Sequence, residues 1–183
     1  MKLQIPYLSQ HQDVKDTTWQ NKSCGIVCVK MILDFLHPDE ITHDTPDSLI
    51  SEGIGTGGYT QEFGWNHESL VRLFRNRGIN AYRQEFVTKT ELYKKKLENT
   101  GTAKIRKMIQ EQELPAIVSV EKGFDENTHS HLIVITGYEA DKNGLTGFYY
   151  HDSDARVGKK EHQFVTKEKF LKYWRRFVIF VEN

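Results

Sequence analysis

Cys24 is the residue whose position in the sequence most strongly indicates chemistry. It begins CGIVCVKMILDFL, residues 24–36, an apolar run broken by Lys30 and Asp34, which predicts a helix buried in the core. The N-terminus of a helix carries partial positive charge and free amides, which stabilise a thiolate and can hold an oxyanion. We therefore interpret Cys24 as a nucleophile, and Gly25 as leaving room for a substrate carbonyl to approach the backbone.

Cys28, the second of the two cysteines in the sequence, is expected to pack in the core. A separation of four residues places Cys24 and Cys28 one helical turn apart on the same face, which is not the C-x-x-C spacing of redox proteins. We expect no disulfide between them.

A nucleophilic thiolate needs a group that takes up and returns a proton near neutral pH, and histidine is suited to this. His131 opens the strand-like run HLIVITGYEA, from which it could reach the cysteine helix, and His129 is the alternative base. Asp152 ends the strand-like run LTGFYYHD, where its carboxylate can accept the imidazole N–H and fix the tautomer. Asp154 is the weaker candidate for that role, because it has the setting of a turn residue.

The same histidines allow a second interpretation, a zinc site. His129 and His131 form an H-x-H pattern, and His151 and Asp152 follow on the next strand-like run. Three such ligands would make a zinc site with one open position. We favour the cysteine interpretation, and we expect neither a metal ion nor another cofactor.

The elements around these residues change character along the chain, from helices to strands. Helices are expected near Ser48, from Asn66 to before Gly78, at 90–98, at 102–112 and from Thr166 to Lys172. Strands are expected in the runs INAYRQEFV (79–87), LPAIVSV (114–120), HLIVITGYEA (131–140), LTGFYYHD (145–152) and RRFVIFVEN (175–183). The fold class is therefore α+β, with N-terminal helices and a buried cysteine-bearing helix packed on a C-terminal antiparallel sheet.

Residues 38–64 lack a sustained period and are expected to form a long loop. They contain GIGTGG at 53–58, which has no lysine after it and is better interpreted as flexible than as a phosphate cradle. A flexible loop of this length would suit a lid over a cleft.

Length, charge and hydrophobicity limit which other classes of protein the sequence fits. The 183 residues are expected to form a single domain, 1–183, and 25 basic against 25 acidic residues give no positive field for nucleic acid. No run reaches the roughly 20 apolar residues of a membrane-spanning helix, and MKLQIPYLSQHQD lacks the apolar core of a signal peptide. We therefore expect no membrane span and a cytoplasmic location.

Four segments together resemble a known family. IPYLSQ, NKSCGIVCVKMIL, HSHLIVITGYE and YYHDSDA are similar, in this order, to the glutamine, cysteine, histidine and aspartate blocks of the C39-like peptidases, which have a papain-like fold. The resemblance implies Cys24 as nucleophile, His131 as general base and acid, Asp152 as its orienter, and Gln10 as an oxyanion donor. Two other glutamines of the same polar segment, Gln12 and Gln20, remain alternatives for the oxyanion position.

The resemblance implies a cysteine peptidase that cleaves a peptide or isopeptide bond through a thioester acyl-enzyme. Two alternatives stay open: an acyltransferase of the transglutaminase or phytochelatin-synthase kind, and a papain-like binding or regulatory module without turnover. Members that process leader peptides are often fused to a transporter. This sequence has neither a membrane segment nor a G-x-x-x-x-G-K motif, which argues against a leader-peptidase role.

Overall fold

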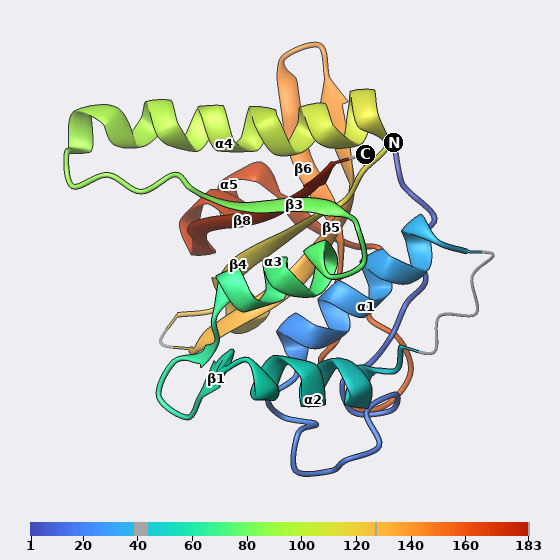
Figure 1. Ribbon diagram of the computed structural model, residues 1–183. Coiled ribbons are helices and arrows are strands. Elements are labelled where there is room, and N and C mark those ends of the chain that lie inside the picture. Colours follow the sequence, from blue (N-terminus) through green and yellow to red (C-terminus); the bar gives the residue numbers. More distant parts are fainter. Residues whose placement is uncertain (39–43, 127, 183) are drawn as a thin grey trace.

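An antiparallel sheet forms the centre of the molecule (Figure 1). In residues 1–38, 44–126 and 128–182, which the computed structural model describes, it contains six strands in the order β3-β8-β4-β5-β6-β7. The strands are β3 (Asn80–Glu85), β4 (Ala116–Glu121), β5 (Ser130–Asp141), β6 (Gly144–His151), β7 (Gln163–Thr166) and β8 (Trp174–Glu182). The predicted strands are confirmed. Strand β7 is an additional strand that was not expected. Strand β3, from the helical half of the chain, joins the C-terminal strands of the sheet beside β8.

Helices cover both faces of the sheet. Figure 1 shows α1 (Cys24–Leu36), α2 (Pro46–Gly55) and α3 (His67–Arg75) on one side and α4 (Glu91–Gln112) on the other. The short helix α5 (Lys167–Tyr173) joins the side of α4, because the ring of its Phe170 stacks on Trp174, which in turn lies against α4. The expected α+β class, with the cysteine helix packed on an antiparallel sheet, is confirmed.

The cysteine helix α1 has the predicted bounds. Its residues from Gly25 to Leu33 are all buried, and it packs against β5, the strand that carries His131. His37, the residue after the helix and before Pro38, is its C-cap. An almost wholly apolar helix is stable here because both the sheet and the neighbouring helices remove its side chains from water.

The predicted starts of three other helices are also confirmed. The Asn66 side chain accepts a hydrogen bond from the Glu68 N–H at the start of α3, and Thr166 accepts one from Lys169 at the start of α5. Near Ser48, α2 begins with a capping box in which Thr45 and Ser48 bond each other's backbone. These polar side chains satisfy amides that a helix leaves without partners.

The prediction of two helices at 90–98 and 102–112 is wrong, because α4 is one helix of 22 residues. Gly101, which would weaken an isolated helix, lies directly on the sheet side chains in this protein. A Cβ atom at position 101 would be 2.4 Å from Trp174 and 2.9 Å from Phe86. Tight packing of the glycine against these rings therefore keeps the helix continuous.

The expected long loop at 38–64 is only partly a loop. Residues 39–43 lie outside the described residues, but the remainder holds α2 and a small ribbon of β1 (Tyr59–Thr60) and β2 (Gly64–Trp65). The first three residues of GIGTGG form the last turn of α2, and the Gly58 N–H donates to the Gly53 carbonyl at 2.8 Å. The interpretation of GIGTGG as a flexible loop is therefore wrong for half of the motif.

Candidate active site

Cys24 is the first residue of α1, and the start of this helix has no side-chain cap. Ser23 occupies the N-cap position without a side-chain hydrogen bond to the helix, and the first turn contains no acidic residue. At α3, in contrast, Asn66 caps the helix and Glu68 lies in the first turn. The amides and partial positive charge of α1 are thus left for a thiolate or a bound anion.

His131 and Asp152 form a buried hydrogen-bonded pair close to that helix start. They stand at the beginning of β5 and directly after the end of β6, two strands that are neighbours in the sheet. His131 Nε2 lies 2.6 Å from Asp152 Oδ1, and only 3% and 7% of the two residues are exposed. Since Asp152 engages Nε2, the Nδ1 atom is the ring nitrogen left for the Cys24 thiol.

The charges of the three residues support one another. Burial opposes the ionisation of Cys24, but hydrogen bonding to His131, its charge and backbone hydrogen bonds lower the pKa of the thiol overall. Burial also opposes the charged form of His131, yet hydrogen bonds to Asp152 and Cys24 raise its pKa to about 10. The pKa of Asp152 is lowered by His131 despite burial. The arrangement therefore favours a thiolate and an imidazolium at neutral pH.

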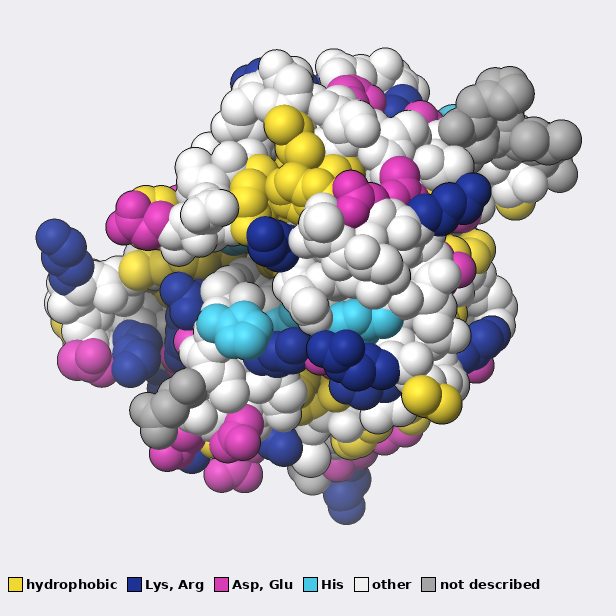
Figure 2. Space-filling view, turned by 90° about the horizontal axis from the view of Figure 1, so that it is seen from below, with side chains coloured by type: hydrophobic (Ala, Val, Ile, Leu, Met, Phe, Trp, Pro, Cys, Tyr) yellow, Lys and Arg dark blue, Asp and Glu magenta, His cyan; other side chains and the backbone are white. Residues whose placement is uncertain are grey.

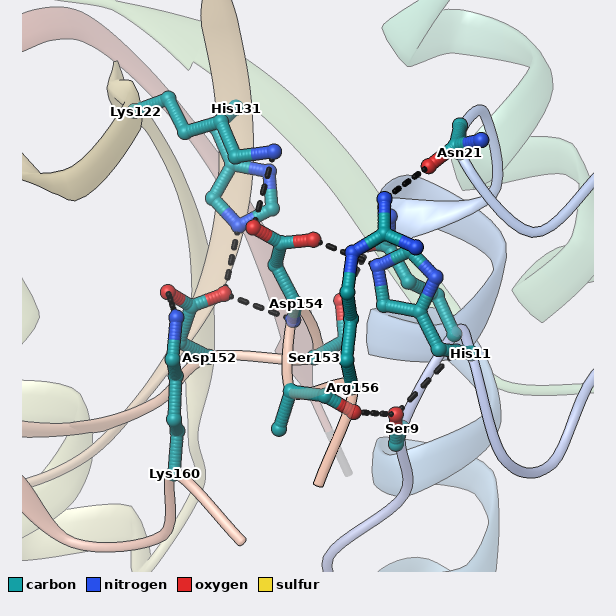
Figure 3. Close-up of polar contacts among 12 residues, drawn as sticks. Ser9, His11, Asn21, Lys122, His131, Asp152, Ser153, Asp154, Arg156 and Lys160 are labelled. Carbon is teal, nitrogen blue, oxygen red and sulfur yellow. Dashed lines mark hydrogen bonds and ion pairs between the residues drawn. The ribbon is translucent and has the colours of Figure 1, made fainter. Parts of the chain in front are cut away.

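Further contacts fix the Asp152 carboxylate (Figure 3). The backbone N–H of Asp154 donates to the same Oδ1 atom at 2.9 Å, and Lys160 Nζ lies 3.8 Å from Oδ2. The backbone carbonyl of Asp152 accepts a hydrogen bond of 2.9 Å from the Tyr7 hydroxyl. A carboxylate with several donors around it holds both its position and its charge.

Gln10 lines the same pocket as Cys24 and His131, and it is 2% exposed. Its backbone N–H donates to the Ser153 carbonyl at 2.9 Å, and its Oε1 accepts from the Ser153 hydroxyl at 3.0 Å. This leaves the Nε2 amide as the part of the side chain that can donate into the pocket.

The two alternative glutamines are engaged elsewhere. Gln12 Nε2 donates to the carbonyls of Ala155 and Gly158, at 3.0 and 2.9 Å, and Gln20 Nε2 donates to the Val14 carbonyl at 3.0 Å. Both amides therefore connect segments of backbone, and of the three glutamines the structure brings Gln10 to Cys24.

The alternative histidine and the zinc interpretation fit the structure poorly. His129 is an exposed residue of the pocket lining, and the histidine ring that Asp152 bonds in the site is that of His131. Both ring nitrogens of His151 bond backbone, Nε2 with the Ile5 carbonyl and Nδ1 with the His162 N–H, each at 3.0 Å. Among the residues described, no group of three or more His, Cys, Asp or Glu side chains is arranged to hold a metal ion.

The pocket over Cys24 has a volume of about 280 Å³ and a mixed lining. Besides Gln10 and His131, its lining includes a wall from the ribbon of β1 and β2, with Tyr59, Phe63 and Trp65. Figure 2 shows histidine and basic side chains close together on the face that carries α2 and the first loop, beside a group of hydrophobic side chains. A peptide could find apolar and polar contacts in such a pocket.

Sequence reasoning missed the aromatic cluster at this wall. Trp19 and Tyr59 have ring centroids 4.8 Å apart, and Trp65 lies 5.3 Å from Tyr59 and 5.8 Å from Trp19. Trp19 lies in the first loop and the other two rings in the ribbon of β1 and β2, some 40 positions later, so no periodic pattern in the sequence could have indicated that they meet.

The interpretation of Gly25 as space for the substrate is wrong. A Cβ atom at this buried position would lie 2.8 Å from Leu70 and 2.9 Å from Leu132. The glycine instead lets these side chains of α3 and β5 pack closely against the first turn of α1.

Comparisons with known proteins identify the family of the chain. The model of the Peptidase_C39 like family matches residues 2–179. Among curated proteins, no significant match is found. In the part of the chain that the structure describes, no helix is long and apolar enough to cross a membrane.

Several solved structures have a similar fold over the whole chain. A protein from Bacillus anthracis described as a C39-like peptidase has a TM-score of 0.62 at 15% identity, with 100% of this chain and 98% of that one covered. A double glycine motif protease from an AMS/PCAT transporter, solved with the leader peptide, gives 0.61 at 13% identity, covering 100% and 94%. The peptidase domain of Streptococcus ComA, a bifunctional ABC transporter, gives 0.53 at 16% identity, covering 98% and 96%. The chain therefore belongs to the C39-like peptidase family and has the papain-like fold of its peptidase domains.

Proposed function

We propose that this protein is a cysteine peptidase in which Cys24 is the nucleophile, His131 the general base and acid, Asp152 the orienter and Gln10 an oxyanion donor. The observation that carries the proposal is the buried His131–Asp152 pair beside an uncapped helix start that holds Cys24. Membership of the C39-like peptidase family supports it independently.

The residues suit the two half-reactions of peptide hydrolysis. The Cys24 thiolate attacks the substrate carbonyl, and the oxyanion accepts hydrogen bonds from the Cys24 backbone N–H and from Gln10 Nε2. The intermediate collapses to a thioester as the C–N bond breaks and protonated His131 gives its proton to the leaving amine. Water then adds to the thioester as His131 takes up a proton from it, and the C–S bond breaks, which releases the acid and regenerates the Cys24 thiolate beside protonated His131.

The substrate is proposed to be a peptide or an isopeptide-linked chain that lies in the pocket next to the aromatic wall. The pocket offers apolar contacts at Phe63 and Trp65 and charged side chains at Lys22, Glu62 and Lys122. One structural neighbour was solved with a leader peptide, which is consistent with a peptide ligand for this fold.

The first test is the rate of alkylation of Cys24 and Cys28 by iodoacetamide from pH 4 to 9, followed by mass spectrometry. We expect rapid labelling of Cys24 at pH 5, about 100-fold slower labelling in His131→Ala, and no change in His129→Ala, the matched control at the pocket rim. Labelling of wild-type Cys24 only near an ordinary thiol pKa of about 8.5 would remove the enzyme proposal and favour a binding module.

A reactive Cys24 would justify a peptide-library screen in the presence of a competing amine. Free carboxylate products would identify a hydrolase, whereas amide products with the added amine would identify the acyltransferase alternative.

A further inference from the structure

A second polar cluster, half-buried, lies beside Asp152 and is centred on Asp154 (Figure 3). Lys122 Nζ lies 2.8 Å from Asp154 Oδ2, and His11 Nε2 lies 2.6 Å from Asp154 Oδ1. The side chains of Asp154 and His11 are 16% and 5% exposed. Burial alone would raise the pKa of Asp154, but its bonds to Lys122 and His11 lower that pKa to about 2. The carboxylate is therefore an anion at neutral pH.

Each member of this cluster lies on a segment that carries a residue of the candidate site, or is hydrogen-bonded through its backbone to such a segment. His11 directly follows Gln10. The backbone N–H of Asp154 donates to Asp152 Oδ1 at 2.9 Å. Lys122, the residue after β4, donates its backbone N–H to the His129 carbonyl at 3.1 Å, on the segment that leads into His131. One carboxylate thus connects three segments that are far apart in the sequence.

The Asp152 carboxylate depends on this cluster for its orientation. Its Oδ1 atom accepts one hydrogen bond from His131 and one from the backbone of Asp154, so a shift of Asp154 would turn the carboxylate away from the imidazole. Gln10 depends on the same loop, through its two hydrogen bonds with Ser153. Functional side chains need to be held within about 0.5 Å of their working positions, and their neighbours supply this precision.

We propose that Asp154, clamped between Lys122 and His11, is a positioning residue that aligns Asp152 and Gln10 with His131. The inference rests on the proposed function of these three residues. The sequence suggested Asp154 as an alternative partner of the His131 imidazole. The role proposed here is different, because the His131 imidazole is bonded by Asp152 and Asp154 bonds His11.

A simple charge effect is the competing explanation, and two substitutions separate it from positioning. Asp154→Asn removes a negative charge near His131, and Lys122→Met removes a positive one. If charge alone mattered, the two variants would shift the reactivity of Cys24 in opposite directions. If the clamp positions Asp152, both variants slow the reaction, because each breaks the same ion pair.

The experiment measures Cys24 alkylation at pH 5 and, by NMR, the downfield N–H resonance of the His131–Asp152 hydrogen bond. We expect alkylation to slow about tenfold in both Asp154→Asn and Lys122→Met, with a weakened resonance, and Lys122→Arg to restore both. The matched control is Glu52→Gln, which breaks the ion pair with Arg77 at 2.9 Å between α2 and the segment after α3. It should lower thermal stability without a change in either signal.

The outcomes distinguish this inference from the proposed function. An alkylation rate and a resonance that stay at wild-type values in both Asp154→Asn and Lys122→Met overturn the positioning role, while a reactive wild type keeps the proposed function. Opposite shifts in the two variants also overturn positioning and favour charge. An unreactive wild-type Cys24 overturns the proposed function, and the resonance still decides whether the clamp orients Asp152. If Asp154→Asn does not fold, the His131–Asp152 resonance in Lys122→Met decides: a weakened resonance supports positioning, and an unchanged one overturns it.

Discussion

The two cysteines of α1 lie in consecutive turns of one helix, yet their side chains have different environments. Cys24, in the first turn, is half-buried and lines the pocket with His131. Cys28, in the next turn, is fully buried, and its thiol lies 3.4 Å from the Leu132 carbonyl. Burial raises the pKa of Cys28 well above its ordinary value, and the neighbouring Cys24 adds to this, whereas the pKa of Cys24 is lowered.

The difference arises from the position in the helix and from the partner, since the residue type is the same. Only the first turn has amides without partners inside the helix, so only Cys24 can use them. Only Cys24 has an imidazole within hydrogen-bonding reach. One turn further along, the same thiol is a small apolar side chain in the core.

The largest expected effect comes from removing one thiol at a time. Cys24→Ala should abolish turnover of a substrate found in the peptide screen, a loss of about 10⁴-fold or more, because the nucleophile is gone. Cys28→Ala should keep turnover and lose only about 1 kcal/mol of unfolding free energy through a small cavity. Steady-state kinetics measure the turnover of each variant, and urea unfolding measures its free energy of unfolding. Wild-type turnover in Cys24→Ala would show that Cys24 is not the nucleophile.

A smaller effect is expected from the oxyanion donor. Gln10→Ala should lower kcat about 100-fold with little change in KM or in Cys24 alkylation, because the amide acts on the oxyanion of the transition state and not on the thiolate. Gln20→Ala, whose amide bonds the Val14 carbonyl, is the matched control and should keep kcat. Equal losses in the two variants would show that the glutamines support the loop rather than the reaction.

The smallest predicted effect is a shift in pH dependence. Turnover needs Cys24 without its proton and His131 with its proton, so kcat/KM should rise in acid and fall as the pH passes about 10, the raised pKa of His131. In Asp152→Asn, the hydrogen bond and charge that raise this pKa are lost, and the alkaline limb should move about one unit lower. The pH profile of exposed Asp141→Asn should match wild type. An unmoved limb in Asp152→Asn would show that Asp152 does not control the His131 proton.

Local signals in the sequence were sufficient for much of the fold. The apolar run from Cys24 gave the bounds of α1, and Asn66 and Thr166 marked the starts of α3 and α5, because a buried face and a cap act within one helix. The same logic failed at Gly101, where packing on Trp174 outweighs the low helix propensity of glycine. It also failed for β7, a strand whose exposed residues lack a clear apolar pattern.

For the candidate site, the sequence left open which glutamine and which histidine lie at the pocket of Cys24, because this depends on distances in the folded chain. It offered three glutamines and two histidines, and nothing in their local patterns could separate them. The structure places Gln10 and His131 at the pocket with Cys24, while Gln12 and Gln20 bond backbone and His129 stays exposed. The aromatic wall and the clamp at Asp154 are likewise formed by segments distant in the sequence.

Three features could be predicted from the sequence alone: the α+β class, the cysteine at a helix start, and the order of cysteine, histidine and aspartate that resembles the family. These depend on side-chain periodicity and short motifs, which act over a few residues. The folded structure was needed to show that Gln10 lines the pocket with Cys24, that His131 is buried against Asp152, and that Lys122, Asp154 and His11 join three segments. Such contacts join residues that are 21 positions apart, for His131 and Asp152, up to 143 positions apart, for His11 and Asp154, and they exist only once the sheet has brought the ends of its strands together.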